Sequence, residues 1–269
     1  MPSEPLPDLR PLSEEQHRQN ICQVGRWLYE RGHIVAGEGN LSVRLDANRI
    51  LTTPTCLNKG MMSPCDLVII DLEGRHLQGE RRVSSEVGMH ILFYRMRPDV
   101  NAVCHAHPPT ATGFAVAGQG LDQALLPEVV VCLGKVPLVR YATPGTPDLS
   151  AVLEPCVPHY DALLLANHGA VTCGPDLLTA FYRMETVEHF AKIALNARLA
   201  GEPQLLSTRE VAKLMAARSR YNVTPPPGGG AELPETCDTG ENTTEEITLT
   251  RSELDALVDE AVRKDRSRR

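Results

Sequence analysis

Residues 102–109 read Ala-Val-Cys-His-Ala-His-Pro-Pro, and this stretch decides the class of fold. Its short apolar run, which ends at His105, is typical of a buried strand. A second apolar run, from Ala162 to Leu165, is bounded by loop residues and predicts another strand. The segments around these two strands indicate how they are arranged.

The flanking segments add helices and a hairpin. They are a helix that starts at the capping-box residues Ser13 and Gln16, a strand at 67–72 followed by a turn at Glu73-Gly74, a helix from Ser84 to Arg97 that Pro98 ends, and a helix from Phe181 to Leu199. Strands separated by helices, with one hairpin, predict an α/β fold around a mixed or mainly antiparallel sheet.

The composition excludes several classes of protein. The chain has 269 residues, of which 42% are hydrophobic, enough for one large domain or two small ones with a true core. Its formal charge of −7 argues against sequence-independent binding to nucleic acid or to an anionic membrane. The sequence lacks an apolar run of about 18 residues, so we expect no transmembrane helix.

The first residues and the cysteines bear on location. Residues 1–5 lack the basic and apolar regions of a secretory signal, so we expect a cytoplasmic protein. Eight scattered cysteines include no Cys-x-x-Cys pair, which favours buried cytosolic thiols over a disulfide framework or a structural zinc site.

The C-terminal part of the chain differs from the rest in charge. Residues 222–269 hold eleven acidic and six basic residues. We predict a compact domain over 1–221 and, because it has little to bury, a flexible acidic linker rich in Pro and Gly over 222–246. Residues 247–269 predict a short amphipathic helix, which is not stable alone. Docking on its own oligomer, a disordered extension and recognition in a partner's groove are the three interpretations.

The strongest signal for chemistry is His105-Ala106-His107, followed by Pro108. Proline disfavours helix in the residue before it, so both histidines lie on extended backbone and point the same way. They can bind one metal ion together, although a pair of hydrogen-bonded histidines at a strand end is the simpler alternative. His168, between Asn167 and Gly169 at the end of a second strand, adds a third imidazole. Three histidines leave a zinc coordination position open, as in catalytic sites.

Two further segments are weaker signals by themselves. Ser84-Ser85-Glu86 starts a predicted helix, where hydroxyls and N–H groups can bind an anion and Glu86, in the first turn, can bind a cation or move a proton. The turn Gly37-Glu38-Gly39-Asn40 can present backbone donors to a phosphate. An ordinary helix start and an ordinary turn are the simpler interpretations.

Other polar residues receive structural interpretations. His90 is four residues after Glu86 and could pair with it, but a role in helix packing is preferred. Glu185, Glu188 and His189 lie along the long helix and are interpreted as interface or solvated groups.

These motifs, together with Thr53-Pro54-Thr55, occur in the order and approximate spacing of the class II aldolase/adducin family. The chain resembles this family over roughly residues 13–221. The resemblance implies a three-layer α/β/α sandwich around a largely antiparallel central sheet. It also implies a homotetramer with active sites at the subunit interfaces.

The resemblance further assigns roles to residues. It implies a Zn²⁺ cofactor with ligands His105, His107, His168 and Glu86. It makes Glu86 the catalytic acid and base, and Tyr221 a second catalytic residue. The implied phosphate site consists of Gly39, Asn40, Thr55, Cys56, Ser84 and Ser85. The implied reaction is retro-aldol cleavage of a deoxy-ketose 1-phosphate, L-fuculose or L-rhamnulose 1-phosphate, to dihydroxyacetone phosphate and lactaldehyde.

Three positions depart from the family pattern. Cys56 stands in place of a glycine, Gly37 in place of a threonine, and Val131 in place of an active-site tyrosine. A dehydratase, decarboxylase or epimerase acting on another sugar phosphate is therefore an alternative. A non-catalytic adducin-like scaffold is a further one, but a scaffold has no use for an open metal site.

The tail carries a second resemblance. An enzyme domain followed by a Pro/Gly linker and a short amphipathic helix is similar to proteins that carry encapsulation peptides of bacterial microcompartments. This resemblance implies a shell protein as partner and a location inside a microcompartment.

Overall fold

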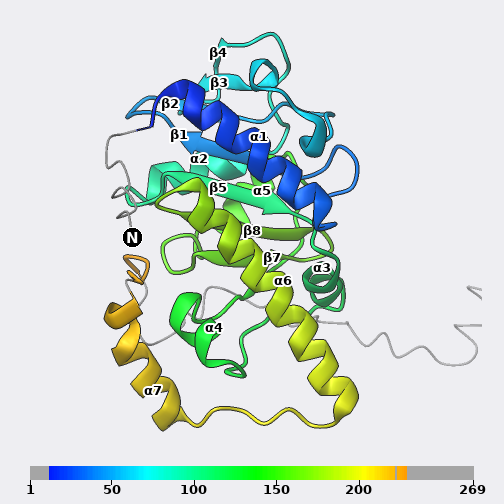
Figure 1. The fold of residues 1–269 in the computed structure, drawn as a ribbon, viewed down its shortest axis with the longest axis vertical. Coiled ribbons are helices and arrows are strands. Elements are labelled where there is room, and N and C mark those ends of the chain that lie inside the picture. Colours follow the sequence, from blue (N-terminus) through cyan, green and yellow to red (C-terminus); the bar gives the residue numbers. More distant parts are fainter. Residues whose placement is uncertain (1–11, 222, 229–269) are drawn as a thin grey trace, which may run out of the picture. The chain divides into compact units, whose positions relative to one another are not determined.

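The computed structural model describes residues 12–221 and 223–228, and in these ranges the chain forms one eight-stranded sheet (Figure 1). The strands are β1 (Asn40–Arg44), β2 (Arg49–Thr52), β3 (Val68–Asp71), β4 (His76–Gln78), β5 (Ala102–Ala106), β6 (Leu138–Val139), β7 (Ala162–Leu165) and β8 (Gly169–Gly174). They lie in the order β4-β3-β2-β1-β5-β8-β7-β6. The described pair β6 and β7 is parallel, and the other described neighbours are antiparallel.

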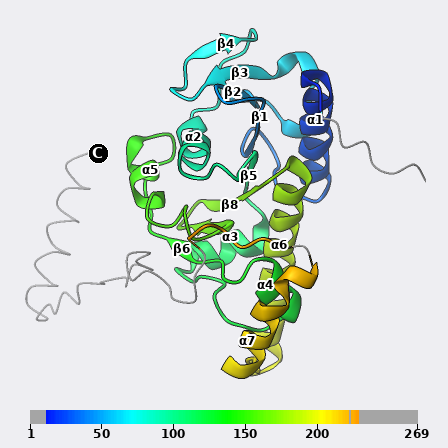
Figure 2. The same cartoon turned by 90° about the vertical axis from the view of Figure 1, so that its left-hand side faces the viewer.

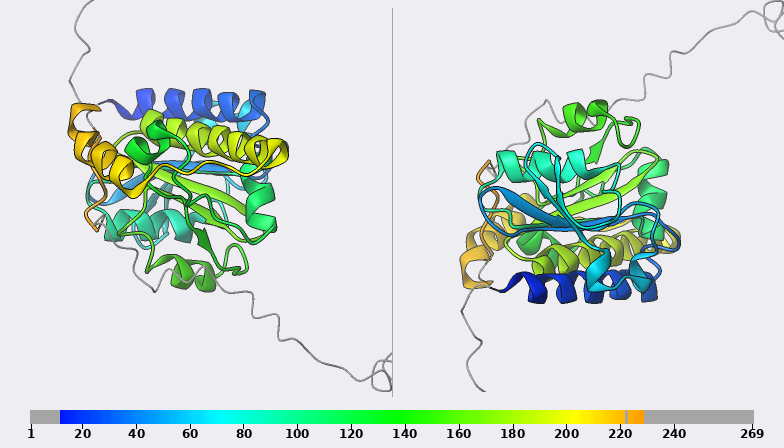
Figure 3. Two further views of the ribbon diagram at one scale, coloured as in Figure 1. Left: turned by 90° about the horizontal axis from the view of Figure 1, so that it is seen from below. Right: turned by 90° about the horizontal axis from the view of Figure 1, so that it is seen from above.

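Helices cover both faces of this sheet. They are α1 (Glu14–Glu30), α2 (Val87–Met96), α3 (Pro109–Val116), α4 (Pro127–Cys132), α5 (Pro147–Leu153), α6 (Leu177–Ala200) and α7 (Thr208–Ala217), with short 3₁₀ turns at Lys59–Met61, Pro64–Asp66 and Arg218–Tyr221. Helices α1 and α6 lie on one face, and α2 and α5 lie on the other (Figure 2). The three layers are clear when the sheet is seen edge-on (Figure 3). The predicted α/β/α sandwich around a largely antiparallel sheet is therefore confirmed.

Successive side chains of each strand point to opposite faces of the sheet, and so they form two apolar cores. Leu41 and Cys104 belong to the core under α1 and α6, whereas Val103 belongs to the core under α2 and α5. Because neighbouring residues of a strand point to opposite faces, Asn40 and His105 lie on the side covered by α2. These two residues are also direct partners in the β1–β5 register.

Most of the predicted elements are present. Helix α1 begins at the capping box formed by Ser13 and Gln16, and β3 lies inside the predicted strand 67–72 and enters a hairpin with β4. Helix α6 begins four residues before Phe181 because Asp176 caps it, accepting the N–H of Thr179 at 2.8 Å.

The start of α2 differs from the prediction. The helix begins at Val87, and Glu86 occupies the N-cap position instead of the first helical turn. Ser84 lies ahead of the helix because its Oγ accepts hydrogen bonds from Asn40 Nδ2 at 3.2 Å and from the N–H of Glu86 at 3.3 Å. The expectation that the helix starts at Ser84 and holds Glu86 in its first turn is therefore wrong.

The C-terminal predictions remain open. Gly228, in the predicted linker, donates its N–H to the carbonyl of Pro158 at 2.9 Å. Residue 222, residues 229–246 of the linker and the whole of the predicted helix at 247–269 lie outside the described residues. Within the described ranges, no helix has both the length and the apolar character that a membrane crossing requires.

Candidate metal centre

Two neighbouring strands bring the three histidines together. His105 lies in β5, His107 follows the end of that strand, and His168 lies in the turn between β7 and β8. Strands β5 and β8 are paired so that Ala106 faces Ala170. The turn is tight, with Asn167 in the left-handed region at φ 55°. The sheet thus converts two distant motifs into one cluster.

The three imidazoles converge at close range. The ring centroids are 4.7 Å apart for His105 and His168, 4.9 Å for His105 and His107, and 5.0 Å for His107 and His168. One nitrogen from each ring lies within 4.8 Å of the others. The predicted triad is therefore assembled within a single chain.

The tautomer of His105 suits a metal ligand. Its Nδ1 donates to the carbonyl of Ala170 at 2.9 Å, because a carbonyl oxygen can only accept. Its Nε2 is then left as a base that points toward His107 and Glu86. Burial lowers the pKa of His105, so the imidazole is neutral at neutral pH, as a metal ligand must be.

Glu86 lies directly beside the histidines. One carboxylate oxygen is 3.0 Å from His168 Nε2, and the other is 3.5 Å from His105 Nε2. Burial disfavours charge on this carboxyl, but hydrogen bonds from His168 Nε2 at 3.0 Å and from Asn40 Nδ2 at 2.9 Å outweigh it. The pKa of Glu86 therefore lies well below its ordinary value, and the group is an ionised carboxylate.

The spacing of these donor atoms fits a divalent metal ion. Two ligand atoms bound at about 2.0–2.1 Å to a tetrahedral zinc ion lie about 3.3 Å from each other. The Nε2 atoms of His105 and His107 are 3.1 Å apart, close to this value. The same distance also suits a hydrogen bond between the two rings, and one nitrogen from each of the three rings lies within 4.8 Å of the others. Nitrogen and carboxylate oxygen are the donors that zinc prefers.

The residues of the implied phosphate site lie in two adjacent loops and just before α2, except Asn40, which is buried at the start of β1. Gly39, at φ 70°, lets the chain pass so close to β5 that a Cβ there would be 3.0 Å from the carbonyl of His105. Cys56 keeps the left-handed backbone, at φ 55°, that a glycine would favour. A Cβ added to Gly37 would be 3.5 Å from Cys56 Cα, so the two loops touch. Thr55 lies in the second loop, where its N–H donates to the carbonyl of Arg82 at 3.0 Å.

Lys59 joins the two loops and was missed by the sequence analysis. Its buried ammonium donates to the carbonyls of Gly37 at 2.6 Å and Leu57 at 2.7 Å. Burial lowers the pKa of this lysine. A lysine within a polar loop gives no local signal of burial, so only the fold could show this contact.

Ser85 and Glu86 open onto a cavity of about 400 Å³ between α2 and the loop before α5. Gly145 and Thr146 line its far side. Glu86 lines this cavity, whereas the three histidines do not.

Tyr221 and Val131 lie elsewhere. Tyr221 is 65% exposed at the end of a 3₁₀ turn, and no contact joins it to the histidines within the described part of the chain. Val131 is buried in α4, where its carbonyl accepts from Arg218 Nε at 2.9 Å. The role implied for Tyr221 would thus need a second subunit and stays a prediction.

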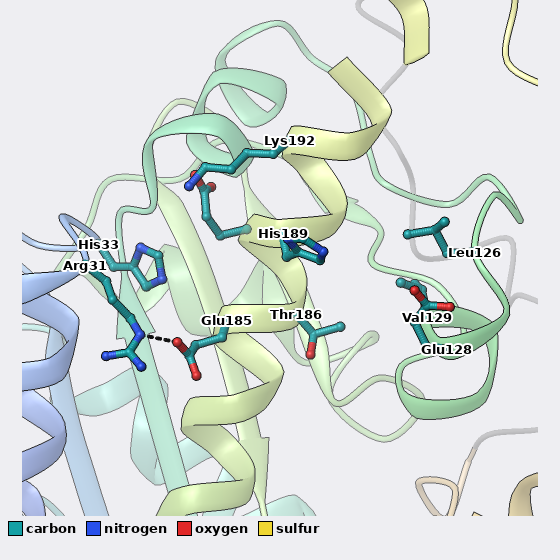
Figure 4. Close-up of a pocket in the computed structure, with 10 residues that line it drawn as sticks. Arg31, His33, Leu126, Glu128, Val129, Glu185, Thr186, His189 and Lys192 are labelled. Atoms are coloured by element: carbon teal, nitrogen blue, oxygen red, sulfur yellow. Dashed lines mark ion pairs between the residues drawn. The ribbon is translucent and has the colours of Figure 1, made fainter. Parts of the chain in front are cut away.

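A larger cavity, of about 510 Å³, lies among the end of α1, α4 and α6 (Figure 4). Arg31 and Glu185 form an ion pair at its edge. One lining residue, His33, contacts the metal centre through backbone, since its carbonyl accepts the N–H of His107 at 2.9 Å. The cavity does not include any of the predicted site residues.

Glu188 corrects one interpretation. This carboxylate is 1% exposed, not solvated, and it accepts the N–H groups of Thr110 at 3.0 Å and Ala111 at 2.9 Å. It therefore caps α3, which begins just after His107 and whose N-cap residue, Pro108, has no polar side chain. Glu188 fixes the segment that carries a metal-ligand candidate.

Known proteins are similar to this chain in sequence and in fold. The class II aldolase and adducin N-terminal domain family matches residues 19–195. A 3-oxo-tetronate 4-phosphate decarboxylase of Haemophilus influenzae is 36% identical over 187 residues, or 68% of this chain and 88% of that protein. An L-fuculose phosphate aldolase of Methanococcus maripaludis is 33% identical over 174 residues, or 65% and 93%.

Solved structures agree with the sequence comparisons. YgbL of Escherichia coli superposes with a TM-score of 0.71 at 32% identity, covering 75% of this chain and 99% of that chain. An L-fuculose 1-phosphate aldolase gives a TM-score of 0.71 at 32% identity, covering 76% and 95%. The matched residues include the histidine cluster and the whole sheet. The chain therefore belongs to the class II aldolase and adducin N-terminal domain family.

Proposed function

We propose that this protein is a zinc-dependent aldolase that cleaves a deoxy-ketose 1-phosphate, L-fuculose or L-rhamnulose 1-phosphate, to dihydroxyacetone phosphate and lactaldehyde. The observation that carries the proposal is the position of Glu86, whose carboxylate lies within 3.5 Å of two histidines of the triad and which also lines a cavity. A base in contact with a Lewis-acid site is what carbon–carbon cleavage next to a carbonyl requires.

The residues have distinct tasks in this reaction. The zinc ion bound by His105, His107 and His168 would supply Lewis-acid stabilisation of the negative charge of the enediolate. Glu86 accepts the proton of the substrate hydroxyl as the carbon–carbon bond breaks and the aldehyde forms. It then returns that proton to the enediolate carbon, giving dihydroxyacetone phosphate. One carboxylate therefore both removes the proton and returns it, and it ends the reaction in its starting charge state.

The loops around Gly39 and Cys56, with Ser84 and Ser85, would hold the phosphate. Backbone N–H groups and hydroxyls bind a phosphate without needing a full positive charge. Binding at this remote group orients the carbon that reacts, so part of the binding energy lowers the barrier. Lys59 keeps the two loops in register.

Decarboxylation is the second candidate, since decarboxylase relatives are as similar as aldolase relatives. Loss of CO₂ from 3-oxo-tetronate 4-phosphate leaves an enediolate, and its protonation gives dihydroxyacetone phosphate. The two reactions thus share the charge that the site stabilises and the product. They differ in the leaving group, since decarboxylation forms no aldehyde and so needs no group at the aldehyde oxygen, such as the tyrosine replaced by Val131.

The shared product gives a direct test. The zinc-loaded protein is offered L-fuculose 1-phosphate, L-rhamnulose 1-phosphate and 3-oxo-tetronate 4-phosphate, and dihydroxyacetone phosphate, lactaldehyde and CO₂ are measured. We expect dihydroxyacetone phosphate and lactaldehyde in equal amounts from one ketose phosphate, and none from the Glu86→Gln variant. Release of CO₂ without lactaldehyde would show that the protein is a decarboxylase and not an aldolase. No product from any of the three substrates would reject both functions.

The assembly and the tail are proposals as well. We propose a homotetramer in which Tyr221 reaches the metal centre of a neighbour, and a shell protein of a microcompartment as the partner of residues 247–269. Sedimentation gives the oligomeric state, and a tetramer with unaltered kcat in Tyr221→Phe would remove the tyrosine's role. Unchanged binding of a shell protein after deletion of 247–269 would refute the targeting proposal.

A further inference from the structure

A chain of buried polar side chains leads from Glu86 into the core under α2. Asn40 Nδ2 donates to Glu86 at 2.9 Å, and Asn40 Oδ1 contacts His90 Nε2. On the other side of the ring, His90 Nδ1 is 2.7 Å from Ser42 Oγ, which is 2.7 Å from the hydroxyl of Tyr94. His90, Ser42 and Asn40 are all at most 2% exposed. The sequence analysis preferred a packing role for His90, and these contacts require another account.

The chemistry of the groups fixes the direction of every hydrogen bond. A carboxylate only accepts, so the amide nitrogen of Asn40 faces Glu86, and the same nitrogen contacts Ser84 Oγ at 3.2 Å. The amide oxygen then faces His90 and also only accepts, so His90 Nε2 carries a hydrogen. Burial lowers the pKa of His90 to about 4, so the ring is neutral and its Nδ1 accepts from Ser42.

We propose that His90 is a positioning residue, which as the neutral Nε2–H tautomer holds the amide of Asn40 in the orientation that donates to Glu86. With the amide reversed, Asn40 would place an oxygen against the carboxylate at hydrogen-bond distance, and two acceptors would repel. His90 prevents that reversal, because its own N–H would then face the amide N–H₂ group. The inference deepens the proposed function, since it rests on Glu86 as the group that moves the proton.

Ser42 and Tyr94 fix the tautomer of His90. A histidine with two free nitrogens could switch tautomers, but the hydroxyl of Ser42 donates to Nδ1 and so keeps the hydrogen on Nε2. Tyr94 in turn donates to Ser42, and its position is held by Arg44, which stacks 4.9 Å from the ring centroid and donates to the tyrosine carbonyl at 2.5 Å. The orientation of one amide at the metal centre thus depends on side chains that a substrate never touches.

Kinetics of paired variants test the role. His90→Leu removes the N–H, whereas the amide of His90→Gln can still donate to Asn40. We expect kcat to fall about 10- to 100-fold in His90→Leu, the range seen for partners behind metal-site residues. KM and zinc content should stay near the wild-type values, and His90→Gln should recover much of the loss. His76→Leu makes the same change on exposed β4 and serves as the control.

A kcat for His90→Leu within about twofold of wild type, or an equal loss in both His90 variants, would overturn the proposal. The tautomer is tested independently of any substrate by NMR of the wild-type protein labelled with ¹⁵N-histidine, with His90→Gln used to assign the signal. We expect the Nε2–H form at neutral pH, and an Nδ1–H or cationic ring would overturn the proposal. If all three substrates fail while the Nε2–H form is found, the proposed function falls and the hydrogen-bond direction stands.

Discussion

Gly169→Ala should weaken metal binding by adding a single methyl group. The structure places the new carbon 2.5 Å from His107 Cδ2 and 2.6 Å from the carbonyl oxygen of Ala106. Carbon atoms in contact prefer about 3.5–4.0 Å, so the ring of His107 must retreat by about 1 Å. Metal ligands tolerate displacements of only about 0.2 Å. We therefore expect zinc affinity to fall about 10- to 100-fold, as when a supporting contact of a ligand is lost.

The assay is competition for zinc against a chromophoric chelator, on protein whose fold is checked by circular dichroism. Gly113→Ala is the matched control, because a Cβ at that position in α3 meets nothing within 4 Å and the helix follows directly after His107. It should bind zinc as the wild type does and gain about 0.4–1 kcal/mol in stability. A zinc dissociation constant for Gly169→Ala within about twofold of wild type would refute this account of the site.

Three further predictions follow from the same contacts. Glu188→Ala leaves the N–H groups of Thr110 and Ala111 without their acceptor and should lower the free energy of unfolding in urea by about 1–3 kcal/mol. Glu185→Ala is the control, because it breaks only the partly exposed ion pair with Arg31. It should change the free energy of unfolding by less than about 1 kcal/mol. Because His90 binds a proton more weakly when folded (pKa about 4) than when unfolded (about 6.5), stability should fall as the pH drops through this window. Between about pH 7 and 5, the free energy of unfolding of the metal-free wild type should fall by about 2 kcal/mol more than that of metal-free His90→Gln. The same pH dependence of stability in both proteins would contradict the conclusion that His90 is neutral when folded. A strong chelator should abolish dihydroxyacetone phosphate release while leaving the circular dichroism spectrum unchanged, and zinc should restore the activity; activity that survives complete removal of metal would exclude the proposed chemistry.

The parts of the fold that the sequence predicts are those with local signals. Apolar runs marked β5 and β7, a capping box marked α1, and proline marked the extended backbone of His107. The histidine triad was predictable because His107 precedes Pro108 and His168 precedes Gly169, two residues that break regular structure, and because His105 lies two positions before His107.

The contacts that the sequence did not predict join residues far apart in the chain. Ser42 and His90 are 48 residues apart, Thr110 and Glu188 are 78 apart, and Gly37 and Lys59 are 22 apart. A polar residue has the same local pattern whether it meets water or a buried partner, so its role becomes visible only when the sheet is assembled. The late start of α2 has the same origin, since Asn40 on β1 engages Ser84.

The pairing of β5 with β8 has a consequence for how the protein is made. His105 and Ala170 are partners across 65 residues, so the histidines meet only after a long loop has closed. The metal therefore cannot nucleate folding, and it joins a scaffold that is already built. Zinc should slow unfolding and leave the rate of folding unchanged. A newly synthesised chain can thus mature in a cell poor in zinc and acquire its metal afterwards, without unfolding to do so.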